Sequence, residues 1–164
     1  TPTQTNTIYQ NAFSLENSDL VFENNSIYFS QNKNEFFSLD ARTGTIKWAQ
    51  SVNSSLRPTI IENLIFTVSN EGYLFIIDDL TGNIIRITDV LKNFKDRLDI
   101  KPIGFIHSKN KVYVSLSNGK LVTINSSTGI QENITKISNS KISRPYILNN
   151  SMYLIKDNAL AKIE

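Results

Sequence analysis

The stretch LDARTGTIKW (residues 39–48) sets an aspartate after an apolar residue and then a Thr-Gly pair three and four positions later. The sequence repeats this unit as IDDLTGNIIR (residues 77–86) and as INSSTGIQEN (residues 124–133). Glycine takes the positive φ that closes a tight turn, and an Asp or Asn side chain accepts bonds from nearby backbone amides. Each unit therefore predicts a turn between two strands. The residues assigned to this structural repeat are Asp40, Thr43, Gly44 and Trp48, then Asp78, Thr81 and Gly82, then Asn125, Thr128 and Gly129.

The spacing of the units identifies the kind of repeat. Asp78 follows Asp40 by 38 residues, Asn125 follows Asp78 by 47, and Glu164 follows Asn125 by 39. Basic-proline pairs recur at a similar distance, at residues 57–58, 101–102 and 144–145. Each period of about 40 residues holds four short segments rich in Ile, Val, Tyr and Phe, which is typical of a propeller blade. The sequence thus predicts an all-β fold, a β-propeller of four-stranded antiparallel blades.

About four blades are expected, at residues 19–52, 57–90, 100–138 and 142–164. Phe29, Phe66, Val114 and Leu154 are expected at equivalent positions in the second strands of these blades. The last blade would lack its outermost strand. The N-terminal segment 1–18 contains TIYQNAF (residues 7–13), which could supply a closing strand, because an open sheet edge invites aggregation.

The longer second spacing places an insertion at DVLKNFKDRLD (residues 89–99). Leu91, Phe94 and Leu98 recur there at helical spacing, so a helical insertion is predicted. Two roles stay open for its apolar residues. They could pack onto the propeller, or Phe94 could be a partner-binding anchor flanked by Lys95 and Arg97.

Composition excludes several classes of protein. The net charge is only +2, so no basic field indicates nucleic-acid binding. The apolar runs are far shorter than the roughly 20 residues of a membrane-spanning helix, so the chain is not expected to span a bilayer. No cysteine is present, which removes disulfides, thiolate metal sites and cysteine nucleophiles from this stretch.

No catalytic, cofactor-binding or metal-binding residues are assigned. His107 is a lone histidine beside a turn and makes neither a metal site nor a hydrolase dyad by itself. The adjacent Asp78 and Asp79 could be imagined as an acid-base pair or as calcium ligands, but they occupy a repeat turn. The protein is therefore expected not to be an enzyme.

These motifs carry a family resemblance. VYVSLSNGKLVTIN followed by the Thr-Gly turn, and I-K-W once, resemble the PQQ-like β-propeller repeat. The closing runs KVYVSLSNGKLVTINSSTG and SRPYILNNSMYLIKDNALAKIE further resemble the C-terminal half of the BamB family, propeller lipoproteins of the bacterial outer-membrane β-barrel assembly machinery. The sequence departs from the pattern where Arg86 and Asn133 replace the tryptophan found at Trp48.

The resemblance implies an eight-bladed ring, of which this chain would supply about four blades. It also implies a periplasmic, outer-membrane-associated scaffold without catalytic residues or cofactors, whose protein partner is the outer-membrane β-barrel insertase. Exposed blade faces would favour self-association. The alternative is a fragment of a PQQ-dependent quinoprotein dehydrogenase, a family that calls for a stacking tryptophan, calcium ligands and usually adjacent cysteines.

Overall fold

The computed structural model describes residues 17–31 and 34–163. The expected closing strand at residues 7–13 and the repeat position Glu164 lie outside the described residues, so both stay predictions. None of the described helices is long and apolar enough to cross a membrane.

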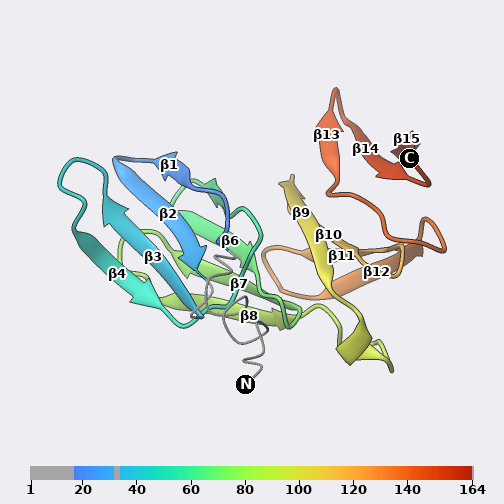
Figure 1. The fold of residues 1–164 in the computed structure, drawn as a ribbon, viewed down its shortest axis with the longest axis horizontal. Helices are drawn as coiled ribbons and strands as arrows, with labels where there is room; N and C mark the ends of the chain where they lie inside the picture. Colours follow the sequence, from blue (N-terminus) through green and yellow to red (C-terminus); the bar gives the residue numbers. More distant parts are fainter. Residues whose placement is uncertain (1–16, 32–33, 164) are drawn as a thin grey trace, which may run out of the picture.

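The described chain forms consecutive antiparallel sheets, and Figure 1 shows them following one another from the N-terminal to the C-terminal end. The first sheet contains β1 (Val21–Glu23), β2 (Ser26–Gln31), β3 (Glu35–Asp40) and β4 (Ile46–Gln50), and the second contains β5 (Thr59–Ile61), β6 (Leu64–Val68), β7 (Tyr73–Asp78) and β8 (Ile84–Asp89). The third contains β9 (Pro102–Ser108), β10 (Lys111–Leu116), β11 (Lys120–Asn125) and β12 (Gln131–Lys136), and the last contains β13 (Tyr146–Leu148), β14 (Ser151–Lys156) and β15 (Ala159–Ile163). The prediction of an all-β fold of propeller blades is confirmed.

Each sheet is a meander in which neighbouring strands in the sequence pair with one another. Tight turns join the first two strands of a sheet. Asn24 and Asn25 turn the chain between β1 and β2 with φ of 48° and 59°, and Asn149 and Asn150 do so between β13 and β14 with φ of 49° and 61°. Asparagine tolerates this left-handed conformation better than most residues, which explains the Asn pairs in the sequence.

The hydrophobic core lies between successive sheets. Tyr28 and Phe36 of the first sheet pack with Ile65 and Ile77 of the second, all of them fully or almost fully buried. A larger cluster joins the second sheet to the third and includes the buried Phe105. Because each sheet buries its faces only against its neighbours, the order of the sheets decides which side chains form the core.

The second-strand alignment was wrong at one position. The apolar residue before each repeat position (Asp40, Asp78, Asn125 and Glu164) pairs with Ile27, Ile65, Val112 and Met152, respectively. Two residues further on lie Phe29, Thr67, Val114 and Leu154, so the second-sheet equivalent is Thr67 and not Phe66. The prediction was one residue off in the second sheet, and a shift of one residue moves a side chain to the other face of the sheet.

The prediction of a helical insertion at residues 89–99 was also wrong. β8 continues to Asp89, and the described residues after it form turns followed by one 3-10 turn, Arg97–Asp99. A segment this short is marginal as an α-helix in water, and its ends are fixed by the sheets it joins. Leu91 is buried, whereas Leu98 is 92% exposed. The expectation that both residues pack on one helical face therefore fails for Leu98.

Candidate protein-interaction surface

The repeated turns share one hydrogen-bond pattern. The Asp40 carboxylate accepts bonds from the Thr43 amide at 2.8 Å and the Thr43 hydroxyl at 3.0 Å. The Asp78 carboxylate accepts the corresponding pair from Thr81, both at 2.7 Å. In the third sheet the Asn125 side-chain oxygen accepts the Thr128 amide at 3.0 Å. These residues stabilise the turn between the third and fourth strands of their sheets.

The same bonds set the pKa of both turn aspartates. The hydroxyl and amide of Thr81 hold the pKa of Asp78 below its usual value, and the amide and hydroxyl of Thr43 do the same for Asp40. A carboxyl whose pKa is lower in the folded state stabilises the fold above its unfolded pKa of about 4. That contribution is lost as the pH falls through the lower, folded pKa.

We expect Asp78→Asn to change how stability depends on pH but to leave the turn formed, because Asn125 forms the same turn in the third sheet without a charge. The melting temperature of the variant should lie below that of the wild type at neutral pH, and the gap should close as the pH falls below about 4. Thermal unfolding followed across this range measures the gap. Asp96→Asn is the control, since the Asp96 side chain is exposed. A gap that stays constant with pH would contradict the assignment.

Successive sheets are joined by one side chain that recurs four residues after the turn glycine. The Trp48 indole N–H donates to the Asp79 carbonyl at 2.9 Å, and its ring covers Gly82. The corresponding Arg86 donates to the Ser126 carbonyl at 3.1 Å and covers Gly129. In both pairs, the outer strand of one sheet binds the repeat turn of the next.

Asn133 holds the same position in the third sheet but has a different contact. Its side chain donates to the Thr135 hydroxyl within its own strand. A cleft of about 730 Å³ lies between the third and last sheets, lined in part by Asn133, Thr135 and Met152. The short Asn133 side chain therefore does not bridge the third and last sheets, whereas Trp48 bridges the first and second sheets and Arg86 bridges the second and third.

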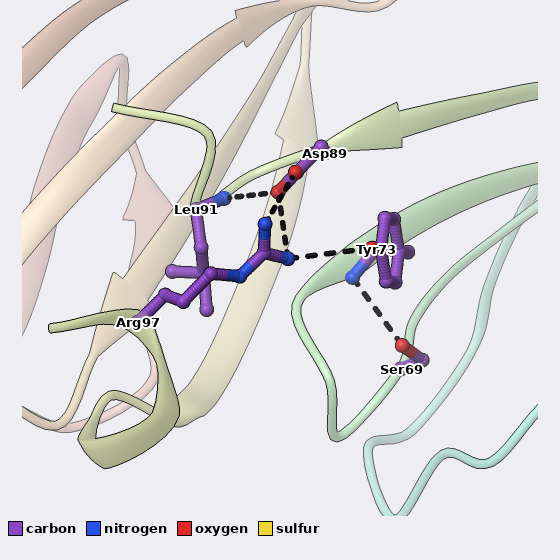
Figure 2. A network of polar contacts seen from close by, with 5 residues as sticks. All are labelled: Ser69, Tyr73, Asp89, Leu91 and Arg97. Atoms are coloured by element: carbon purple, nitrogen blue, oxygen red, sulfur yellow. Dashed lines mark hydrogen bonds and ion pairs between the residues drawn. The ribbon is translucent and has the colours of Figure 1, made fainter. Parts of the chain in front are cut away.

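The connection between β8 and β9 carries the residues proposed for partner binding, and a polar network fixes it to the second sheet (Figure 2). The Arg97 guanidinium lies 3.0 Å from the Asp89 carboxylate and donates to the Tyr73 hydroxyl at 3.3 Å. Asp89 also accepts the Leu91 amide at 2.9 Å. Leu91 packs so closely against Gly72 that a Cβ added to residue 72 would lie 2.6 Å from the Leu91 Cγ. Arg97 is thus an anchoring residue of this segment.

The segment is also held to the third sheet. Phe94 is partly buried against the larger core cluster, and the Lys120 ammonium lies 5.0 Å from the centre of its ring. Asn93 donates to Gln131 at 2.8 Å. Lys95 is exposed, as is Leu98. Phe94 is thus partly buried and Arg97 is tied to Asp89 and Tyr73, whereas Lys95 and Leu98 are exposed. The helical spacing had predicted a packed position for Leu98.

His107 contacts Ser126 and Phe66. Its Nε2 is 3.2 Å from the Ser126 hydroxyl, and its ring centre is 4.8 Å from that of Phe66. Burial lowers the pKa of His107, which favours the neutral ring. Within residues 17–31 and 34–163, no group of three or more His, Cys, Asp or Glu side chains could hold a metal ion.

The chain is similar to a known family and to several solved structures. The family model that matches residues 1–88 is described as outer membrane protein assembly factor BamB. No curated protein matches the sequence. Among solved structures, BamB from Moraxella catarrhalis is similar with a TM-score of 0.70 and 14% identity, over 88% of this chain and 41% of that one. This chain therefore spans well under half the length of that protein.

Two further structures share the fold. The computationally designed Ika4 protein matches with a TM-score of 0.72 and 15% identity, over 88% of each chain. The quinohemoprotein alcohol dehydrogenase from Comamonas testosteroni matches with a TM-score of 0.60 and 16% identity, over 72% of this chain and 20% of that one. At these identities, the likeness shows a common fold.

The described residues do not fit a PQQ and calcium site. Such a site calls for a tryptophan free to stack on the cofactor, whereas Trp48 is stacked on Phe36, with ring centres 5.9 Å apart, and covers Gly82. The turn carboxylates of Asp40 and Asp78 are engaged by their own threonines. Trp48 therefore serves the junction between the first two sheets, and the repeat aspartates serve their own turns.

Proposed function

This chain belongs to the PQQ-like β-propeller repeat family whose matching model is described as outer membrane protein assembly factor BamB, and on this premise we propose that it is a non-catalytic protein-binding scaffold. Its task is to assist the assembly and insertion of β-barrel proteins into the bacterial outer membrane. The partner is the outer-membrane β-barrel insertase. The full-length protein works in the periplasm, held at the outer membrane by a lipid anchor.

The observation that carries this proposal is an exposed apolar side chain on a rigidly anchored segment. Leu98 is 92% exposed, although the segment around it is fixed by the Arg97–Asp89 pair and by the packing of Phe94. A rigid scaffold that presents an apolar residue in a connecting loop is a common design for protein recognition, because little ordering entropy is lost on binding. Lys95 lies beside it and supplies a charged rim.

The roles within the segment then divide in two. Leu98 and Lys95 contact the insertase, whereas Phe94 and Arg97 hold the segment against the third and second sheets. This division explains why a loop between two blades needs an ion pair, a cation–π contact and a buried phenylalanine. It also predicts that the anchoring residues affect binding through the order of the segment.

The test is site-specific photo-crosslinking of the full-length protein in its own cells. A photoreactive residue at Leu98 should yield a crosslinked product that contains the insertase. The matched control is Leu80, which is 77% exposed but lies in the repeat turn of the second sheet. Asp89→Asn should reduce the yield at position 98 severalfold, and Asp96→Asn should leave it unchanged. Equal yields at positions 98 and 80, or PQQ-dependent dye reduction by the intact protein, would contradict the proposal.

A further inference from the structure

The docking position that joins successive sheets has no occupant on the first sheet among residues 17–31 and 34–163. In the second and third sheets, the turn glycine is covered by Trp48 or Arg86 of the preceding sheet. Gly44 is the equivalent glycine, and no atom of the described residues would lie within 4 Å of a Cβ there. The turn of the first sheet therefore has the same receptor geometry as the other two, with no described occupant.

The sheet face beside this turn is apolar. Register places Phe22, Ile27 and Leu39 next to one another across three strands, with Ile46 paired to Leu39. Phe22 is 66% exposed and Ile46 is 61% exposed. The opposite face of this sheet carries Tyr28 and packs on the second sheet. Within the described part of the chain, the first sheet thus has one covered apolar face and one exposed apolar face.

The last sheet has an open apolar face at the other end of the chain. Tyr146 pairs with Tyr153, and Ile155 pairs with Leu160, so these four side chains share one face. Ile155 is 53% exposed and Leu160 is 73% exposed. They line a concave surface of about 510 Å³. Figure 1 shows the first and last sheets at opposite ends of the molecule, each with its outer side turned away from the intervening sheets.

We propose that these two faces bind each other between two copies of this chain, head to tail. The packing has the same direction as the packing within the chain, in which one apolar face of a sheet packs on the repeat turn and apolar face of the next. In the described last sheet, which has three strands, the apolar face of β13–β15 would make this contact in place of a fourth-strand residue such as Trp48 or Arg86. Each chain offers one face of each kind, so two chains can close into a ring, as heterologous interfaces do when the rotation closes. Open apolar faces of this kind normally find a partner. The inference goes beyond the proposed function and does not depend on it.

The test is the mass of the purified 164-residue chain in solution, measured by light scattering and analytical ultracentrifugation. We expect twice the 18.6 kDa of one chain. Phe22→Asp on the first sheet and Ile155→Asp on the last sheet should each halve this mass. The matched control is Ile85→Asp on the second sheet, because Ile85 and Ile155 are both 53% exposed. This control should leave the mass unchanged.

Mixing the two monomeric variants separates this arrangement from others. The mixture retains one unaltered pair of faces, so it should recover the mass of a dimer, which also shows that both variants are folded. A symmetric contact between like faces would respond to only one of the two substitutions. A monomeric wild-type chain, a dimer insensitive to either substitution, or a mixture that stays monomeric would each overturn the proposal.

Discussion

Trp48→Ala is expected to lower the free energy of unfolding by about 3 kcal/mol, near the lower end of values for buried aromatic residues. The indole stacks on Phe36 at 5.9 Å, lies 6.1 Å from the Tyr28 ring, and donates to the Asp79 carbonyl. Its removal leaves a void between the first two sheets and an unsatisfied carbonyl. Urea unfolding followed by circular dichroism measures the loss.

Trp48→Phe is the matched control for this prediction. It keeps an aromatic ring on Phe36 but removes the indole N–H, so it should cost about 1 kcal/mol, the usual contribution of one hydrogen bond. If Trp48→Ala changed stability by no more than about 0.5 kcal/mol, as exposed substitutions do, the residue would not join the sheets in the way described.

The second large effect is expected at Gly82, which is covered by the same indole. Gly82 has a φ of +73°, and a Cβ there would lie 2.6 Å from a Trp48 ring atom. An alanine would therefore add overpacking of about 1–3 kcal/mol to the backbone strain of a left-handed residue, which is about 1–2 kcal/mol. We expect Gly82→Ala to destabilise the protein by about 3 kcal/mol in the same urea assay.

Gly44→Ala separates the two contributions to this effect. Gly44 has a similar φ of +71°, but no described atom is close to a Cβ there, so the variant should show the backbone strain alone. The excess at Gly82 should disappear in a Trp48→Ala background, because the two residues contact each other. Equal losses at both glycines would mean that the indole does not restrict this position.

Much of the fold could be predicted from the sequence because the deciding signals are local. The Thr-Gly turns require a small set of residues within five positions, and the strands between them show through their Ile, Val and aromatic content. The repeat distance then gave the blades and the family resemblance, which the family match and the shared fold confirm.

The candidate site was less predictable because it depends on contacts between distant residues. Leu91, Phe94 and Leu98 have helical spacing, yet the sheets on either side hold the segment in turns, through Asp89, Arg97 and Gly72. The sequence predicted partner-binding residues in this segment, and their binding stays a prediction. The structure shows that Phe94 is partly buried, whereas Lys95 and Leu98 are exposed. Leu98 had no sequence signal of exposure, since its neighbours predicted a packed face.

The positions of the turns, the repeat distance and the β-sheet nature of each unit could be read from the amino-acid sequence alone. Those properties follow from backbone preferences of Gly, Asn, Asp and β-branched residues over a few positions. Packing in three dimensions was needed to show that Trp48 and Arg86 bind the turn of the next sheet, that Thr67 rather than Phe66 matches Phe29, and that Leu98 faces solvent. The reason is that register, burial and the contacts between sheets depend on residues about 30 to 40 positions apart, whose packing no local preference specifies.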